Sequence, residues 1–391
     1  MELDIFFEPV TYKIESEPGQ TDFNRIGDII TVNEKGKSFP SLENIKLALI
    51  GVDEDRMGLK NRGCAAAPGK VRPYLYNLYS HWTTLKIADL GNIKRGHTVE
   101  DTYFAVKEVT AYLIKNGIVP IIIGGSQDLT YANYLAYENI GRIINIATVD
   151  PLFDLGHDEN ELNSRSYLSR IILHQPNFLF NYTNLGYQSY FVNQDAIQLM
   201  KNLFFDFYRL GDVRKYPEEV EPMVRDADIL SFDMSAIRYS DAPGNYYAGP
   251  NGFRGEEACR ICYYAGMSDK LSSIGFYEFN PGLDPRGQTA HLLAQMIWYF
   301  IDGFVNRQGD FPEKDRNSFI RFRVFIDDLN EELIFLKSKK TGRWWIEVPI
   351  KNKANERYGR QHQIPCSYND YRTALRQELP DRWWKMQQKL M

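Results

Sequence analysis

Two short acidic stretches contain the residues best suited to chemistry. In the first, Asp150 and Asp154 lie four residues apart, with Leu152 midway between them. In the second, Asp233 is followed two residues later by Ser235. Closely spaced carboxylates after an apolar run are typical of cation sites in metallohydrolases, where imidazole or further carboxylate ligands complete the set. Leu152 and Ser235 interrupt that pattern, and two interrupted motifs argue for a function other than metal-dependent hydrolysis.

Each acidic stretch follows an apolar run of strand length. Such runs alternate with amphipathic segments, and this alternation predicts βαβ units around a parallel sheet that is buried on both faces. The predicted strands are residues 45–52, 118–123, 143–149, 229–232 and 271–279, and the predicted helices include residues 98–115, 129–139 and 289–304. We therefore expect an α/β core.

Polar clusters follow the ends of these predicted strands, at residues 53–55, 124–128, 150–154, 233–235 and 278–281. In open α/β sheets the carboxyl ends of the strands form the ligand crevice, so we expect the clusters to converge. They make up the candidate site.

The composition excludes several functional classes. With 43% hydrophobic and 25% charged residues the chain resembles an ordinary globular protein. A formal net charge of −5 gives no basis for nucleic-acid binding, which needs a clustered basic face. No apolar run approaches the ~20 residues of a membrane span, and the acidic N-terminus differs from a signal peptide. We therefore expect a cytoplasmic protein that binds no nucleic acid and has no membrane span.

The character of the sequence changes after residue 306. Residues 332–337 and 343–348 flank a basic turn and predict a β-hairpin, and residues 368–391 predict a helix interrupted by Pro380. Four of the six tryptophans lie in this tail, which suggests packing against the main domain or a partner. We divide the chain into an N-terminal arm that packs on the core (1–40), an α/β domain (41–306) and a C-terminal extension (307–391) of hairpin, basic loop and Trp-rich helix.

The order of the polar segments resembles the ureohydrolase family, which includes arginase, agmatinase and formimidoylglutamase. Residues 61–72 and 88–92 look like the family's glycine loop and its Asp-x-Gly. Residues 124–128, 149–154, 231–238 and 278–284 stand in the places of Gly-Gly-Asp-His, Asp-Ala-His-x-Asp, Ser-Phe-Asp-x-Asp-x-x-Asp and Glu-x-Asn-Pro-x-x-Asp. The resemblance, from about Leu47 to Phe304, implies a three-layer arginase-like fold with a central, mostly parallel sheet.

The family's chemistry uses two Mn²⁺ ions and a bridging hydroxide that attacks a guanidinium or amidine carbon. The resemblance places six residues at the metal-binding positions: Gln127, Asp150, Leu152, Asp154, Asp233 and Ser235. Gln127 and Leu152 replace histidines and Ser235 replaces an aspartate, so one metal site loses both of its private ligands. We therefore expect no binuclear manganese site, because a leucine has no lone pair and a neutral hydroxyl is a poor substitute for a carboxylate.

At most one metal ion is compatible with the ligands that remain. Asp150, Asp154 and Asp233 with Gln127 would suit a single Mn²⁺, Mg²⁺ or Ca²⁺. The alternative that we favour is that no metal is bound, and that loop backbone or basic neighbours compensate the three carboxylates. Arg238 is a candidate counter-ion, and Arg165 brings a second cation into the region where the family binds its substrate.

Three hypotheses about function follow. The first is a binding or structural protein that has lost hydrolysis, with a possible protein partner on the C-terminal extension. The second is a hydrolase of linear amidines that uses one divalent cation. The third is a small-molecule sensor that uses Glu278, which orients the cationic substrate group in the family, together with Asn61. We assign no catalytic role to the residues at the degenerate positions, Gln127, Leu152 and Ser235. The resemblance also implies a homo-oligomer.

Overall fold

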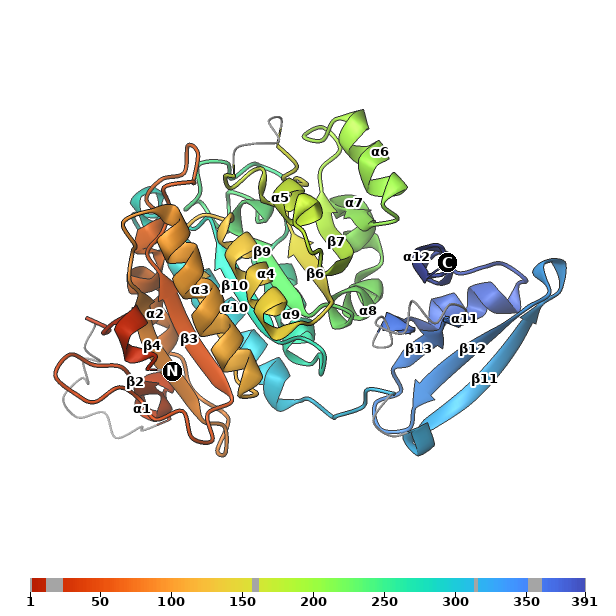
Figure 1. The fold of residues 1–391 in the computed structure, drawn as a ribbon, viewed down its shortest axis with the longest axis horizontal. Coiled ribbons are helices and arrows are strands. Elements are labelled where there is room, and N and C mark those ends of the chain that lie inside the picture. The colour runs from red at the N-terminus through yellow and green to blue at the C-terminus, as the bar shows by residue number, and fades with distance from the viewer. Residues whose placement is uncertain (1, 12–23, 157–161, 313–315, 351–360, 391) are drawn as a thin grey trace.

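The computed structural model describes residues 2–11, 24–156, 162–312, 316–350 and 361–390. Its core is a ten-stranded sheet with helices on both faces (Figure 1). The strands lie in the order β1 (Phe7–Glu8), β4 (Ile87–Ile93), β3 (Leu47–Val52), β5 (Val119–Gly124), β10 (Ser273–Tyr277), β9 (Ile229–Asp233), β6 (Ile144–Val149), β7 (Leu179–Tyr187) and β8 (Asp206–Arg209), and β2 (Thr31–Val32) pairs with β4. Only the β1–β4 pairing of this sheet is antiparallel among the described strands. The predicted α/β class is confirmed.

Helices cover the two faces because the central strands are apolar on both sides. In β3, Ala48 and Ile50 pack in one core cluster, and Leu47 and Leu49 pack in another. The first face is covered by α3 (Val99–Lys115), α4 (Leu129–Ile140) and α5 (Tyr167–Leu173), and the second by α2 (Ala67–Tyr76), α8 (Val220–Arg225), α9 (Gly255–Gly266) and α10 (Gln288–Val305). The other α-helices before the extension are α1 (Ile26–Ile29), α6 (Gln194–Asn202) and α7 (Leu210–Lys215). Alternation of side chains along each strand thus explains the continuous apolar runs.

Strands β4, β7 and β8 were not among the predicted strands. In β7 the apolar run is interrupted by buried Asn181 and Asn184. Their amides are satisfied inside the protein, because Asn181 donates to Asp206 at 3.0 Å and Asn184 donates to the Leu152 carbonyl at 2.7 Å. Polar residues can occupy a buried strand when such partners exist, and those partners are distant in sequence.

The C-terminal extension is larger than the predicted hairpin and helix. It is a four-stranded antiparallel sheet of β11 (Phe319–Ile326), β12 (Glu331–Ser338), β13 (Trp344–Glu347) and β14 (Gln363–Cys366), followed by α11 (Tyr368–Leu375) and α12 (Asp381–Leu390). The predicted hairpin corresponds to β12 and β13, and the predicted helix is split before Pro380. Trp383 is buried inside the extension, whereas Trp384 is 43% exposed. No helix in the described ranges is long and apolar enough to cross a membrane.

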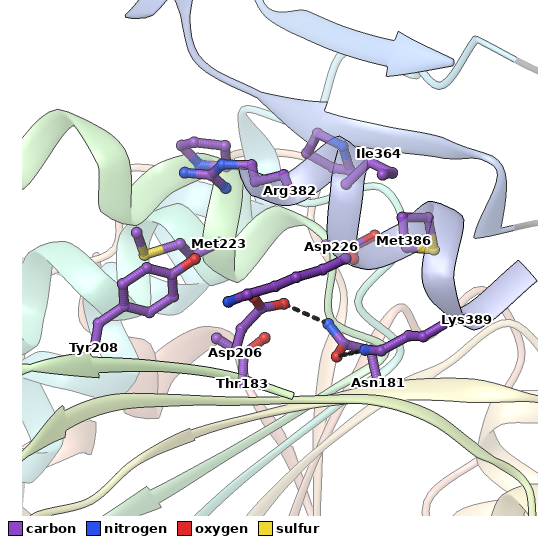
Figure 2. Close-up of a pocket in the computed structure, with 13 residues that line it drawn as sticks. Asn181, Thr183, Asp206, Tyr208, Met223, Asp226, Ile364, Arg382, Met386 and Lys389 are labelled. Atoms are coloured by element: carbon purple, nitrogen blue, oxygen red, sulfur yellow. Dashed lines mark hydrogen bonds and ion pairs between the residues drawn. The ribbon is translucent and has the colours of Figure 1, made fainter. Parts of the chain in front are cut away.

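Ion pairs attach the extension to the edge of the main sheet. Figure 2 shows that the amide of Asn181 in β7 bonds to Asp206 of β8 and to Lys389 of α12. Lys385 of α12 bonds to Asp206 at 2.9 Å, and Arg382 bonds to Glu219 at 2.7 Å. Burial alone would raise the pKa of Asp206, but the two lysine charges hold it below its ordinary value. Only a cavity of about 30 Å³ remains in this contact, so the extension and the core pack closely.

We expect Asp206→Ala to weaken this contact by about 2 kcal/mol, because it leaves two partly buried lysines without their carboxylate. Urea unfolding measures the change in global stability, and hydrogen exchange of the α12 amides in the folded protein measures the local weakening. The matched control is Glu34→Ala, which removes an exposed ion pair with Lys37 and should change stability by less than about 0.5 kcal/mol. Equal effects of the two substitutions would show that the Asp206 contact does not hold the extension.

Candidate functional site

The polar clusters converge at the carboxyl ends of five adjacent strands, β3, β5, β10, β9 and β6. Each strand carries at least one candidate residue at its end or in the loop after it, and the set is Asn61, Gln127, Glu278, Asp233, Asp150 and Asp154. All six are buried. Gly125 permits the close approach of two of these loops, because a Cβ there would lie 1.5 Å from the carbonyl oxygen of Glu54. The convergence expected from the sequence is therefore present.

Asp150 and Asp233 are held by the backbone of the residues at the degenerate positions. The Leu152 N–H donates to Asp150 Oδ1 at 2.7 Å, and the Ser235 N–H donates to Asp233 Oδ1 at 2.6 Å. The Ser235 hydroxyl is buried and has no hydrogen-bond partner among the described groups. These residues thus orient the carboxylates through their main chain.

Asp150 and Asp154 form a close acidic pair. Asp154 adopts a left-handed backbone conformation with φ of 50°, which is uncommon outside glycine and places its carboxyl group against Asp150. With both groups ionised, Asp150 Oδ2 and Asp154 Oδ2 have no hydrogen-bond donor in the described chain. Protonation of either carboxyl group would supply a donor to the other.

Glu278 is bonded to the protein through both carboxyl oxygens. Its Oε2 accepts from the Asn61 amide at 2.7 Å, and its Oε1 accepts from the Gln127 N–H at 3.0 Å. Its φ of 65° is again left-handed, and its carbonyl accepts from Asn61 and from Asn245. The structure thus brings Asn61 and Glu278 together, and they bond to each other.

Burial of so many carboxyl groups raises their pKa values. Desolvation is the largest cause for each, and mutual repulsion adds to it. The pKa of Asp154 and that of Asp233 rise to about 7, and that of Glu278 rises to about 8. The pKa of Asp150 lies well above its ordinary value because of burial and the charge of Asp154. Several of these groups are therefore protonated at neutral pH.

Arg165 is a cation whose charge acts on the carboxyl groups of this cluster. Its charge lowers the pKa values of Asp154 and Asp233, although burial outweighs it. Its guanidinium lies 3.7 Å from the centre of the Tyr247 ring, which fixes it as a cation–π pair. Arg238, the counter-ion suggested by the sequence, is paired instead with Asp241 at 2.8 Å. The reason is local, since Asp241 follows it by three residues.

A cavity of about 350 Å³ leads to the acidic pair. Asp154, Asn163 and Arg165 are its polar lining residues nearest the acids, and Leu59, Leu152 and Phe191 are among the apolar ones. Leu59 and Phe191 are about half exposed, so the cavity opens to solvent. A ligand here would meet apolar walls, one fixed cation and buried acids.

The residues present do not fit a binuclear manganese centre. The unpartnered oxygens of Gln127, Asp150, Asp154 and Ser235 are neutral or carboxylic donors, and no imidazole lies among them. Within the described ranges, no group of three or more His, Cys, Asp and Glu side chains is arranged to hold a metal ion. Hard oxygen donors of this kind suit one cation such as Mg²⁺ or Ca²⁺ better than two manganese ions.

Sequence reasoning missed three residues that shape the site. Asn184 supports the turn from Asp150 to Leu152, Tyr167 accepts a hydrogen bond from the Gln127 amide at 3.3 Å, and Tyr247 supports Arg165. Asn184 lies in the strand that the apolar-run criterion overlooked. The aromatic residues carried no local signal, because their roles depend on contacts between distant loops.

We expect the metal-free protein to lose stability as the pH rises from about 5 to 8. Carboxyl groups with raised pKa values keep protons in the folded state that the unfolded chain releases above pH ~4, so unfolding becomes easier through this range. Asp154→Asn should reduce the loss by on the order of 2 kcal/mol. Urea unfolding in the presence of a chelator measures it. The exposed Asp195→Asn is the control, and an identical pH slope for Asp154→Asn and the unmodified chain would contradict the assignment.

Comparisons with known proteins agree with this arrangement. A curated formimidoylglutamase from Staphylococcus aureus (strain MSSA476) is 23% identical over 304 residues, which cover 74% of this chain and 96% of that protein. A formiminoglutamase from Trypanosoma cruzi, solved with Mn²⁺, superposes with a TM-score of 0.66 at 20% identity and covers 73% of this chain and 100% of its own. The formimidoylglutamase of Bacillus subtilis gives a TM-score of 0.66 at 19% identity, with coverage of 76% and 96%.

These likenesses establish the fold of the part of the chain that they cover. The model of the family described as "Arginase family" matches residues 45–302, which span the strands and loops that build the site. The chain therefore belongs to the arginase family.

Proposed function

We propose that this protein uses the arginase fold as a binding or structural protein and has lost binuclear-manganese hydrolysis. The observation that carries the proposal is that Leu152 and Ser235 contact the carboxylates through their backbone N–H groups. At positions where the family resemblance implies metal ligands, these residues give their backbone N–H groups to Asp150 and Asp233, and their side chains give no ligand. Metal-assisted hydrolysis requires a bound water whose pKa is lowered by the cations. The loss of the second ion removes the two-metal activation that the family resemblance implies.

Arg165 supports the same proposal. In a metal-dependent site the cations neutralise the carboxylates, whereas here protons and a fixed guanidinium neutralise them. The stack on Tyr247 holds the guanidinium beside the cavity that contains Asp154. An incoming cation therefore meets a positive charge already in place, which lowers its affinity.

A second candidate is a hydrolase of linear amidines, in the manner of the formimidoylglutamases among its relatives. The observation that favours it is the presence of unpartnered oxygens on Gln127, Asp150 and Asp154, which are the ligands expected for one hard cation. A carboxyl group with a pKa of about 7, such as Asp154, would also suit general-base catalysis.

We further propose a cytoplasmic homo-oligomer with a protein partner on the C-terminal extension. Oligomerisation is an expectation from the family resemblance, and the extension lies outside the residues that the family model matches.

Metal content and turnover distinguish the two candidate functions. We expect protein loaded with excess Mn²⁺ and then gel-filtered to keep less than one ion per chain by mass spectrometry, and to release no ammonia or formamide from formimidoylglutamate. Two retained ions, or turnover that depends on Asp154, would refute the loss of hydrolysis. One retained ion that disappears in Asp154→Ala would favour the second candidate.

Restoring the ligands provides a matched test of the site itself. The combined variant Gln127→His, Leu152→His and Ser235→Asp should raise Mn²⁺ retention toward two ions per chain, because it supplies the missing imidazoles and carboxylate. Circular dichroism checks that the variant folds. Folded protein that gains no manganese would show that these residues do not stand at ligand positions.

Removal of the fixed charge should favour cation binding. We expect Arg165→Gln to tighten Tb³⁺ or Mn²⁺ binding about fivefold to tenfold, as removal of a nearby unit charge implies. The exposed Arg170→Gln is the control, since it removes the same charge outside the cavity. Equal metal affinities of the two variants would show that the charge of Arg165 does not oppose cation binding in the cavity.

A further inference from the structure

The C-terminal sheet exposes one long edge strand. β11 pairs with β12 over eight consecutive residues without a register shift, and no described strand pairs with its other side. In Figure 1, β11 is the strand of this sheet that lies farthest from the main sheet. The contact around Asp206 anchors the extension through α12, and none of the described residues that line it belongs to β11.

The backbone groups that face the open edge can be identified from the ladder. The Lys339 N–H donates to the Ser318 carbonyl, so even-numbered residues of β11 bond to β12. In an antiparallel pair the intervening residues direct their N–H and C=O groups outward. Phe319, Arg321 and Arg323 therefore present their backbone groups to the open edge, and no described group bonds to the outward backbone of Arg321 or Arg323.

At the C-terminal end of β11, a side-chain amide already makes the backbone hydrogen bonds that a neighbouring strand would make. The side chain of Gln377 donates to the Phe325 carbonyl at 3.1 Å and accepts from the Asp327 N–H at 2.9 Å. Gln377 has a left-handed backbone with φ of 66°, just after α11. An amide that bonds to successive outward groups imitates the next strand, and it independently supports the outward direction of the odd-numbered residues.

The edge lacks most of the features that protect edge strands. Residues 319–326 contain no proline, glycine or bulge, and the strand is eight residues long. Such an edge is a template for strand addition.

The only charged residues of β11 are Arg321 and Arg323, whose side chains are 50% and 63% exposed.

The charges of Arg321 and Arg323 determine which kind of strand can pair with the open edge of β11. Side chains directly opposite one another across a strand pair interact, and like charges there are destabilising. A second copy of β11 centred on Arg321 or Phe322 would place arginine opposite arginine. Residues 307–391 as a whole contain 18 Lys and Arg against 12 Asp and Glu, whereas the chain has a net charge of −5. Exposed ion pairs with Glu347 and Glu332 leave both guanidinium groups available for more bonds.

We propose that the outer edge of β11 binds an extended acidic segment of a partner protein, which adds to the sheet as a fifth strand. Backbone bonds to Arg321 and Arg323 give the affinity, and carboxylates on alternate residues of the partner face the two guanidinium groups. The proposal is independent of the chemistry in the arginase-like cavity.

The test uses the full chain and an acetylated, amidated fluorescent peptide of eight alternating Glu and Val residues. Fluorescence anisotropy should show saturable binding of this peptide and at least tenfold weaker binding of the matched Lys/Val peptide. Arg321→Pro should weaken binding about tenfold relative to Arg321→Val. Both variants lose the guanidinium, but only proline removes the outward N–H, and the ladder to β12 is unchanged.

Two further measurements complete the test. Arg323→Glu should reverse the preference between the acidic and basic peptides, and circular dichroism should show that each variant keeps its fold. Absence of saturable binding, equal binding by Arg321→Pro and Arg321→Val, or equal affinity for both peptides would overturn the proposal. A change of oligomeric state in Arg321→Pro by analytical ultracentrifugation would also overturn it, because a second copy would then be the occupant.

Discussion

Burial of four carboxyl groups at the ends of neighbouring strands is the constraint on which the rest of the site depends. Asp150, Asp154, Asp233 and Glu278 are each shielded from water, so their charges repel one another at low effective dielectric. Backbone N–H groups donate to Asp150 and Asp233, and the charge of Arg165 lowers the pKa values of Asp154 and Asp233. Burial nevertheless raises the pKa values of all four groups, which favours their protonated forms.

The left-handed conformations of Asp154 and Glu278 belong to the same constraint. Asp154 lies in the loop after β6, and Glu278 directly follows β10. Such conformations cost roughly 1–3 kcal/mol for residues other than glycine and persist where the surroundings determine them. Here the Asn61 and Gln127 bonds to Glu278 and the acidic pair with Asp150 supply those surroundings.

The extension follows a different principle. It contributes its own apolar core of β-sheet and helices, and it joins the main sheet through charges of opposite sign around Asp206. Because the lysines lie on the last helix and the carboxylate on an edge strand, the contact covers the β8 edge of the main sheet. The same arrangement leaves the open edge, that of β11, at the far side of the extension.

The sequence by itself determined the α/β class, the convergence of the strand-end clusters and the presence of Leu152 and Ser235 where the family resemblance implies metal ligands. These follow from local periodicity and from the chemistry of each residue type, which do not depend on distant contacts. Only the tertiary structure decided that Arg165 rather than Arg238 faces the acids, that β7 is a buried strand despite its asparagines, and that the tail forms four strands. These depend on partners farther along the chain: Tyr247 for Arg165, Asp206 for Asn181, and β14 for β13. No local pattern encodes which distant group will supply the compensating bond.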